Sequence, residues 1–380
     1  MLDIDPFHVM EVVAAAEARE RAGDRVFHLE VGQPSTGAPA AALARLHELT
    51  AGHTLGYTTS RGIPELPPAI AAHLAASHGL DVDPARIAVT QGASGAFVLA
   101  LLAAFEPGAR VGVTEPGYPC YRNMLRALHM EPVPIALDPD DAFALDLETL
   151  EGCMPLDGVI VASPSNPTGT VLTPDELRAV TEWCDANGVR FISDEIYHGL
   201  TYDGAETATA TAMSDEAIVI NSFSKYFSMT GWRMGWMVLP EQLLTQVDRL
   251  AQNLVICPPT PSQHVALAAL GCAEELDAHV ERYAVNRRVL LDGLPRAGIT
   301  EFAPANGAFY LWARTDHLAA DSQHLSAEWL RDVGVAATPG LDFHPTDGHR
   351  WMRFSFSGTT ETMHGAVEAL ATWRMRQLAR

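Results

Sequence analysis

Short runs rich in β-branched residues alternate with longer helix-like stretches over the middle of the chain, and this alternation most constrains the fold. The runs typical of strands cover residues 86–90, 110–114, 158–163, 190–194, 217–221 and 234–239. The helix-like stretches between them include residues 94–105, 174–187 and 241–253. The second of these has Thr173 as an N-cap, Pro174 in the first turn and Glu176 two positions later, and it stops at Asn187-Gly188. Such alternation predicts an α/β fold with an open, largely parallel sheet that helices cover on both faces.

The pattern changes after about residue 275. A long charged helix is expected at residues 274–294, and shorter strands are expected at 308–313 and 350–356. Two further helices fit residues 323–333 and 360–378. We therefore predict a large domain of residues 45–275 and a smaller α+β domain made of residues 1–44 and 276–380.

Acidic residues dominate the charged side chains, with 47 Asp and Glu against 25 Lys and Arg and a formal net charge of −22. Nucleic acids and anionic membranes repel such a surface, so neither is expected as a partner. The N-terminus carries acids where a secretory signal has basic residues, and no apolar run approaches the roughly 18 residues that span a membrane. The cysteines are scattered and odd in number, which argues against a disulfide framework or a cysteine metal site: Cys120, Cys153, Cys184, Cys257 and Cys272. A globular cytoplasmic protein without a metal is the resulting expectation.

Polar side chains follow the predicted strands, at the edge where open α/β sheets bind their ligands. The residues in these positions are Tyr118, Asn166, Asp194, Tyr197 and Lys225, together with the Gly/Ser-rich segment 91–95. Because the carboxyl ends of parallel strands share one edge of the sheet, we expect these residues to form a single site.

Lys225 is the only lysine of the chain. An arginine keeps its proton at any workable pH, whereas a partly buried lysine can lose it and become a nucleophile. A coding bias towards arginine could leave one lysine by accident, but its position among the other strand-end groups favours amine chemistry.

The loop Gly92-Ala93-Ser94 precedes an apolar helix, so its free N–H groups suit a phosphate, and Arg233 could neutralise the same phosphate. An aldehyde cofactor with a pyridine ring and a phosphate would use all of these groups.

Three motifs carry a resemblance to a known family. They are Ser222-Phe223-Ser224-Lys225 followed by Gly231-Trp232-Arg233-Met234-Gly235, then Ser165-Asn166-Pro167-Thr168-Gly169, and Ser193-Asp194-Glu195-Ile196-Tyr197. In order and spacing the sequence resembles the fold-type I, pyridoxal-phosphate-dependent aminotransferases of class I/II, nearly from end to end. The resemblance implies a large domain with a mostly parallel seven-stranded sheet covered by helices, plus a smaller α+β domain. It also implies a transaminase (EC 2.6.1.-) that moves an amino group between an amino acid and a 2-oxo acid through a Schiff base of pyridoxal 5′-phosphate with Lys225.

The resemblance further implies roles for individual residues. Lys225, Asp194 and Tyr197 would be catalytic: Lys225 would also shuttle a proton, and Asp194 would keep the pyridine nitrogen protonated. Tyr197 and Asn166 would bond the ring hydroxyl, and Tyr118 would stack on the ring. The implied phosphate ligands are Ala93, Ser94, Ser222 and Arg233, with Tyr57 reaching in from the neighbouring subunit of a homodimer with shared active sites.

The implied substrate-binding residues are Arg353, Gly32 and Asn166. Arg353 would clamp the α-carboxylate in a bidentate manner, through two N–H groups of its planar guanidinium. Some dicarboxylate-specific relatives carry a lysine where this chain has Ser94, and Arg61 or Arg122 could substitute for it. The sequence therefore favours neutral or aromatic amino donors. A second departure, Leu66-Pro67-Pro68 in place of the family's usual Leu-Arg pair, could alter the entry of the local helix.

Two other functions fit the same motifs less well. The scaffold also supports lyases, cyclases and synthases, such as C–S lyases and 1-aminocyclopropane-1-carboxylate synthase. A non-catalytic regulatory protein is a more remote alternative, because such proteins carry a basic DNA-binding module that this acidic chain does not show. His198, next to the Asp194 motif, is interpreted as structural, because Lys225 already supplies proton transfer.

Overall fold

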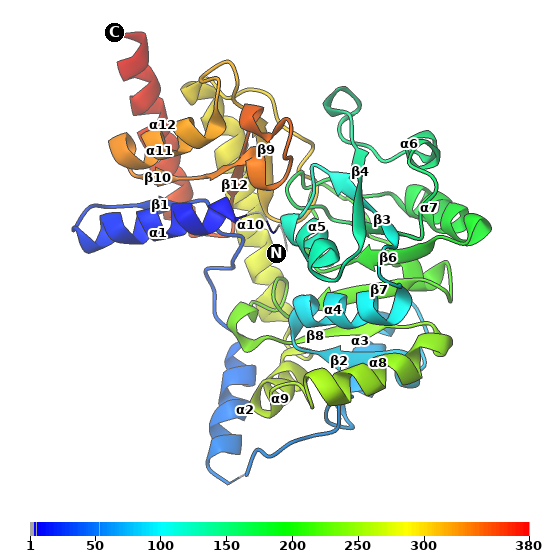
Figure 1. Cartoon of the computed structure of the whole chain (residues 1–380). Helices are drawn as coiled ribbons and strands as arrows, with labels where there is room; N and C mark the ends of the chain where they lie inside the picture. Colours follow the sequence, from blue (N-terminus) through cyan, green and yellow to red (C-terminus); the bar gives the residue numbers. More distant parts are fainter. Residues whose placement is uncertain (1–3, 5, 53, 380) are drawn as a thin grey trace.

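A computed structural model of the protein describes residue 4, residues 6–52 and residues 54–379. Its central feature is a seven-stranded sheet in the order β2-β8-β7-β6-β5-β3-β4. The strands are β2 (Ile87–Thr90), β3 (Arg110–Glu115), β4 (Glu131–Ala136), β5 (Gly158–Ala162), β6 (Arg190–Asp194), β7 (Ile218–Ser222) and β8 (Gly235–Val238). Neighbours from β4 through β7 pair in parallel, and β8 lies antiparallel to both β2 and β7. The predicted α/β fold with a mostly parallel sheet is confirmed (Figure 1).

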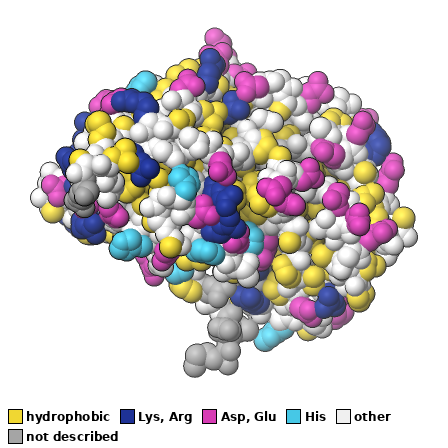
Figure 2. All heavy atoms as spheres, turned by 90° about the horizontal axis from the view of Figure 1, so that it is seen from above, with side chains coloured by type: hydrophobic (Ala, Val, Ile, Leu, Met, Phe, Trp, Pro, Cys, Tyr) yellow, Lys and Arg dark blue, Asp and Glu magenta, His cyan; other side chains and the backbone are white. Residues whose placement is uncertain are grey.

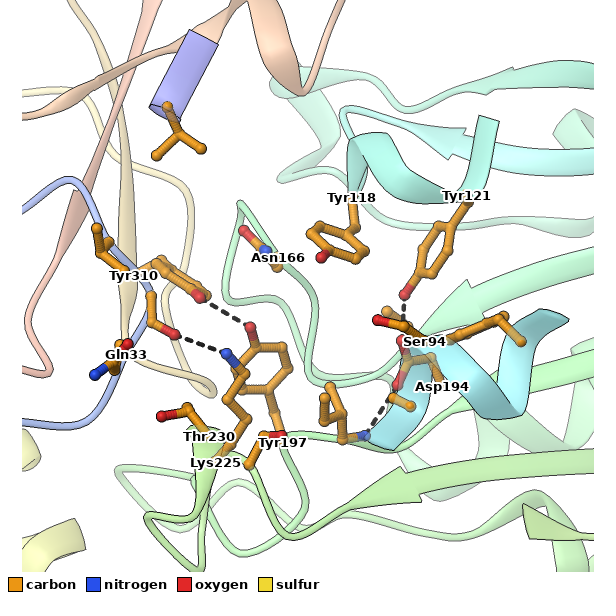
Figure 3. A pocket seen from close by; sticks show the side chains of 18 of the residues that line it. Gln33, Ser94, Tyr118, Tyr121, Asn166, Asp194, Tyr197, Lys225, Thr230 and Tyr310 are labelled. Atoms are coloured by element: carbon orange, nitrogen blue, oxygen red, sulfur yellow. Dashed lines mark hydrogen bonds between the residues drawn. The ribbon is translucent and has the colours of Figure 1, made fainter. Parts of the chain in front are cut away.

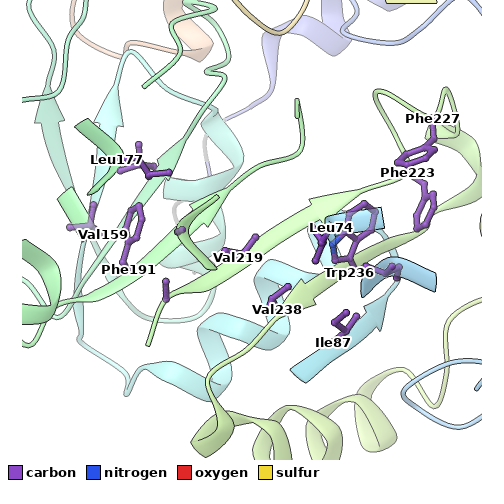
Figure 4. Close-up of a cluster of buried hydrophobic side chains, with 14 of the residues drawn as sticks. Leu74, Ile87, Val159, Leu177, Phe191, Val219, Phe223, Phe227, Trp236 and Val238 are labelled. Carbon is purple, nitrogen blue, oxygen red and sulfur yellow. The ribbon is translucent and has the colours of Figure 1, made fainter. Parts of the chain in front are cut away.

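Alternate residues of the central strands point to opposite faces of this sheet, and each face carries its own hydrophobic core. On one face Ile160, Ile192 and Ile220 pack with helices α4 (Gly92–Ala104), α5 (Pro119–Ala127) and α8 (Glu241–Leu254). On the other face Phe191 and Trp236 belong to a larger cluster, part of which Figure 4 shows. The helices of that face are α3 (Leu66–His78), α6 (Leu147–Gly152), α7 (Pro174–Asn187) and α9 (Thr260–Ala269).

A second, smaller sheet lies beside the first and has the antiparallel order β11-β12-β9. Its strands are β9 (Tyr310–Arg314), β11 (Thr338–Pro339) and β12 (Trp351–Ser355). The helices of this part are α10 (Ala273–Gly293), α11 (Ser322–Val333) and α12 (Thr360–Leu378). A further core, which includes Tyr283, Trp329 and Phe354, fills the space between these elements.

The N-terminal segment joins the C-terminal part of the chain. Strand β1 (Phe27–His28) pairs in parallel with β10 (Val335–Ala336), and α1 (His8–Arg21) packs against α11 and β11. Helix α2 (Ala40–Thr50), in contrast, packs against α9 of the larger part. Both expected boundaries, after residues 44 and 275, fall inside helices α2 and α10. The division into residues 45–275 and residues 1–44 with 276–380 stays a prediction.

The predicted elements agree with the structure to within two residues, and β4 is one of the elements that the sequence did not indicate. This strand contains Pro132 and Pro134, which argue against a strand in a sheet interior. It lies at the edge of the sheet, where only β3 pairs with it. Alternate residues of an edge strand point their N–H groups away from the neighbouring strand, so two prolines in those positions remove no hydrogen bond from the sheet. Leu66-Pro67-Pro68 begins α3, where prolines in the first turn are tolerated.

Among the described residues, no helix is both long enough and apolar enough to cross a membrane. The face seen in Figure 2 carries acidic side chains spread over most of its area, with arginines between them. This distribution agrees with the net charge of −22.

Candidate active site

A cavity of about 280 Å³ lies at the carboxyl ends of β5, β6 and β7, next to residues of the smaller part (Figure 3). The predicted site residues that line it are Gly32, Ala93, Ser94, Tyr118, Asn166, Asp194, Tyr197, Lys225, Arg233 and Arg353. Two predicted residues, Tyr57 and Ser222, are not among the described residues that line it. The structure thus brings ten of the twelve predicted residues into one cavity. They include the strand-end residues Tyr118, Asn166, Asp194, Tyr197 and Lys225, which the shared strand edge led us to expect there.

Lys225 lies in the turn that follows β7, and its Nζ donates a hydrogen bond of 2.7 Å to the Gly32 carbonyl. The same nitrogen lies 5.7 Å from the centre of the Tyr197 ring. Burial, together with the nearby charge of Arg353, lowers the pKa of Lys225 to about 8, although Asp194 opposes the shift. Part of the amine is therefore neutral near pH 7, which is the form that attacks a carbonyl carbon.

Asp194 ends strand β6 with a fully enclosed carboxylate. Its Oδ2 accepts a hydrogen bond from Tyr121 Oη, and its Oδ1 accepts one of 3.1 Å from the backbone N–H of Ile196. Burial raises the pKa of Asp194 to about 6, against the effect of these two donors and of Lys225. A cationic partner in the cavity would therefore gain strongly from this carboxylate.

Arg353, on β12, is 4% exposed and lines the cavity. Its Nη1 donates to Asn166 Oδ1 at 3.0 Å, and its Nη2 donates to the Glu30 carbonyl at 2.5 Å. Its Cζ lies 4.4 Å from the centre of the Tyr310 ring, whose hydroxyl is 2.8 Å from that of Tyr197. These contacts fix the plane of the guanidinium, so it can meet a carboxylate in one orientation only.

The first turn of α4 and Arg233 also line the cavity. Ala93 and Ser94 lie in that turn, and the side chain of its N-cap residue, Gln91, accepts no hydrogen bond from the N–H groups of the turn. A Cβ on Gly92 would lie 2.8 Å from Arg233 Nη2, so only glycine lets the guanidinium approach the helix end this closely. Free helix N–H groups beside an arginine attract an anion such as a phosphate.

Ser222 and Tyr57 lie outside the described lining. Ser222 is 1% exposed and lies behind Ser224, with 2.8 Å between the two Oγ atoms. Tyr57 is 84% exposed on the surface. Gly32 faces Tyr310 so closely that an added Cβ would overlap its hydroxyl.

Neither Arg61 nor Arg122 is among the described residues that line the cavity. Arg61 donates to the Ala85 carbonyl, and Arg122 donates to the Asp342 carbonyl at 2.6 Å. The two candidates for binding a distal carboxylate are thus directed elsewhere.

Several lining residues were not predicted. The polar ones are Gln33, Tyr121, Ser224, Thr230 and Tyr310. Tyr121 follows Tyr118 by three positions at the start of α5, a spacing that places both on one helix face and could have revealed it. The apolar ones include Phe97, Ala162 and Ile196, together with five residues that we call the apolar lining: Phe7, Val9, Met10, Val31 and Met124.

His198 is buried outside the cavity, with Nδ1 3.5 Å from Glu195 Oε2 and its ring 5.1 Å from that of His78. Burial lowers the pKa of His198 to about 3, so the ring is neutral at physiological pH. This placement agrees with the structural interpretation of His198. Within the described part of the chain, no cluster of three or more His, Cys, Asp or Glu residues could hold a metal ion.

Comparison with known proteins gives consistent results. A family model described as aminotransferase class I and II matches residues 24–370. The chain is 47% identical to a valine–pyruvate aminotransferase of Mycobacterium tuberculosis, over 97% of this chain and 96% of that protein. It is 31% identical to a (5-formylfuran-3-yl)methyl phosphate transaminase of Methanocaldococcus jannaschii, over 97% of both chains.

Solved structures agree with these relatives. A crystal structure of an aminotransferase from Mycobacterium tuberculosis matches with a TM-score of 0.96 and 45% identity, over 98% of both chains. The aspartate aminotransferase of Thermus thermophilus with maleate matches with a TM-score of 0.91 and 28% identity, over 97% of both chains.

Proposed function

Because the chain belongs to the class I and II aminotransferases, we propose that it transfers the amino group of an aliphatic amino acid such as valine to pyruvate. As a member of this family it is a pyridoxal-phosphate-dependent amino acid transaminase. The donor and acceptor are those in the name of the 47% identical relative. The observation on this chain that carries the proposal is the apolar lining of its cavity.

The cavity residues fit pyridoxal 5′-phosphate. Ala93 and Ser94, in the first turn of α4, would hold the phosphate together with Arg233. Ser222 would contribute to phosphate binding through its hydrogen bond to Ser224. Tyr118 would stack on the ring, and Tyr197 and Asn166 would bond its hydroxyl. When bound, the cofactor supplies an electrophilic carbon and an electron sink.

Lys225 and Asp194 would perform the acid–base work. The Lys225 amine, with a pKa lowered to about 8 by burial, would attach the cofactor and take the proton from the substrate α-carbon at Nζ. Asp194, anchored by Tyr121 and the Ile196 N–H, would hold a proton on the ring nitrogen by its negative charge.

The substrate would bind between Arg353 and the apolar lining. Arg353, oriented by Asn166 and by the Glu30 carbonyl, would clamp the α-carboxylate beside Gly32. The cations among the described lining residues are Arg233, Lys225 and Arg353, and each already has a role. A second substrate carboxylate would therefore be buried against apolar side chains without a partner, which is costly, whereas an isopropyl group would be buried favourably.

Amino-group exchange with a panel of donors tests this proposal. The holoenzyme is supplied with pyruvate and with valine or aspartate, and 2-oxo acid, alanine and ammonia are measured together. We expect kcat/KM for valine to exceed that for aspartate by at least about tenfold, with the amino group recovered in alanine. Equal or better use of aspartate would refute the aliphatic donor, and release of ammonia would favour a lyase.

We also propose a homodimer with shared active sites. Tyr57, 84% exposed, lies on a surface with Leu254 and Ile256, which are 59% and 50% exposed. Thr260 Oγ1 donates to the Gly56 carbonyl at 2.7 Å, which places Tyr57 beside the 254–260 segment. A partner that covered these apolar side chains could receive Tyr57 in its phosphate site.

Hybrid dimers test the sharing of sites. A dimer of Tyr57→Ala and Lys225→Ala subunits contains one site with both native residues if Tyr57 acts across the interface. We expect the mixed protein to exceed the summed activity of its parents. Activity equal to that sum would contradict a shared site.

A cytoplasmic location is the third part of the proposal, supported by the five cysteines, all of which are free thiols. Fractionation of the source cells should recover the protein with cytoplasmic markers. Recovery in the culture medium would contradict this location.

A further inference from the structure

The N-terminus of α1 lies at the cavity but lacks a cap of its own. Phe7 is the N-cap residue and makes no side-chain capping bond, while Val9 and Met10 lie in the first turn. All three residues belong to the apolar lining. Figure 3 shows the end of this blue helix above the cavity. The Met10 N–H bonds to the Phe7 carbonyl at 2.9 Å, so the N–H groups of His8 and Val9 need acceptors from outside the helix.

Asp342 supplies both acceptors. Its Oδ1 accepts from the His8 N–H at 2.9 Å, and its Oδ2 accepts from the Val9 N–H at 2.8 Å. Its side chain is buried, at 2% exposure, in the 3-10 turn η6 (Gly340–Asp342). A carboxylate on a helix N-terminus also interacts favourably with the helix dipole, and bonds to a charged acceptor are the stronger kind.

The same segment contacts two other parts of the site. The Asp342 carbonyl accepts from Arg122, which lies on α5 one residue after Tyr121. The ring centre of Phe343 lies 4.6 Å from Arg353 Cζ. Asp342 is therefore held at a fixed position relative to both α5 and Arg353. Through its two hydrogen bonds it fixes the position of the first turn of α1.

We propose that Asp342 is a positioning residue that sets the preference of the enzyme for bulky aliphatic donors. It does not line the cavity itself. Its two hydrogen bonds fix the first turn of α1, so that Phe7, Val9 and Met10 stand against the side chain of the bound donor. The choice of donor rests on the proposed function, whereas the link between Asp342 and α1 does not.

Asp342→Asn is the first test variant. An amide of the same shape offers one oxygen and turns an NH2 group towards one of the two N–H donors, which leaves that donor unpaired. The kcat/KM for valine should fall about tenfold, mainly through a higher KM, because the isopropyl group contacts Phe7, Val9 and Met10, which are then held less firmly. Alanine, whose methyl group reaches less of the lining, should lose less than about threefold.

A second pair of variants removes one hydrogen bond without changing Asp342. His8 is the first helical residue, where proline is tolerated, and Phe7 has an extended backbone (φ −104°, ψ 93°), outside the α region that a following proline disfavours. His8→Pro deletes the N–H that Asp342 Oδ1 accepts. His8→Ala is its matched control, because it removes the same side chain and keeps the N–H.

The holoenzyme variants are compared by kcat and KM for valine and alanine, with a 2-oxo acid other than pyruvate as the acceptor for both donors. Hydrogen exchange of α1 and the cofactor absorbance are measured as well. We expect Asp342→Asn and His8→Pro to lower the valine-to-alanine preference and speed exchange in α1, while the absorbance and His8→Ala stay at wild-type values. Equal losses for both donors, or His8→Pro matching His8→Ala, would overturn the proposal. If Asp342→Asn does not fold, the His8 pair decides. If the wild-type enzyme does not use valine, the proposed donor is wrong, and α1 exchange still tests the role of Asp342.

Discussion

Removal of the Tyr121 hydroxyl tests how the site maintains a charged Asp194. The Asp194 carboxylate accepts two hydrogen bonds, one from Tyr121 Oη and one from the Ile196 N–H. Tyr121 is 3% exposed. A buried bond to a charged group contributes about 1.5–3 kcal/mol, so Tyr121→Phe should weaken cofactor binding by about 10- to 100-fold. The pKa of Asp194, raised to about 6 by burial and lowered by Tyr121, should rise further in this variant. Because an acid with a higher pKa stays protonated to higher pH, the acid limb of the kcat/KM profile should move up by about one pH unit or more.

The assay is an absorbance titration of the apoenzyme with pyridoxal 5′-phosphate at pH 7, followed by the pH profile with a saturating acceptor. Tyr202→Phe is the matched control, because it deletes a buried tyrosine hydroxyl that bonds the Ala308 carbonyl at 2.7 Å, away from the cavity. Both variants should lose similar stability, but only Tyr121→Phe should lose cofactor affinity. Unchanged affinity and an unshifted acid limb in Tyr121→Phe would refute the assigned pairing of Asp194 with the ring.

Two further predictions concern stability. Burial raises the pKa of Glu195 from 4.5 to about 8, so the folded state keeps a proton that the unfolded chain loses, and stability falls as the pH rises through this range. In urea unfolding, Glu195→Gln should match the wild type at pH 5 and exceed it by about 4 kcal/mol at pH 8.5; no gain at pH 8.5 would contradict the raised pKa. The hydrogen bond to Glu30 raises the pKa of His28 from 6.5 to about 9, so its stabilisation is complete below 6.5 and lost as the pH rises through 9. His28→Gln should cost about 0.5–1 kcal/mol at pH 6, reduced by solvent screening, and nothing at pH 10, whereas a loss equal at both would exclude this ion pair.

Local sequence signals predicted the helices and the strand-end residues well. The capping box formed by Thr173 and Glu176 marks the start of α7, and Gly188 ends the helix in a left-handed conformation. Asn166, Asp194 and Lys225 could be grouped from the sequence because parallel strands present their carboxyl ends at one edge. Both kinds of signal act within a few residues of the chain or follow from sheet topology.

The apolar lining and the position of α1 could not be predicted in the same way. Phe7 and Val9 reach the cavity because Asp342, more than 330 residues away, binds the first turn of α1. No periodicity or spacing encodes such a contact, which depends on how the two ends of the chain pack together. Tyr310 was missed for a related reason: it lies in a predicted strand region but enters the site only through the pairing of β9 with β12.

The turnover of Lys225→Arg with valine and pyruvate tests the catalytic role of Lys225 most directly. Arginine keeps the positive charge and the long side chain, but it does not lose its proton at workable pH. Since Lys225 is the only lysine of the chain, no second amine of this kind can replace it. We expect kcat for alanine formation to fall by at least about 10³-fold. Turnover within tenfold of the wild type would contradict the assignment of Lys225 as the catalytic residue.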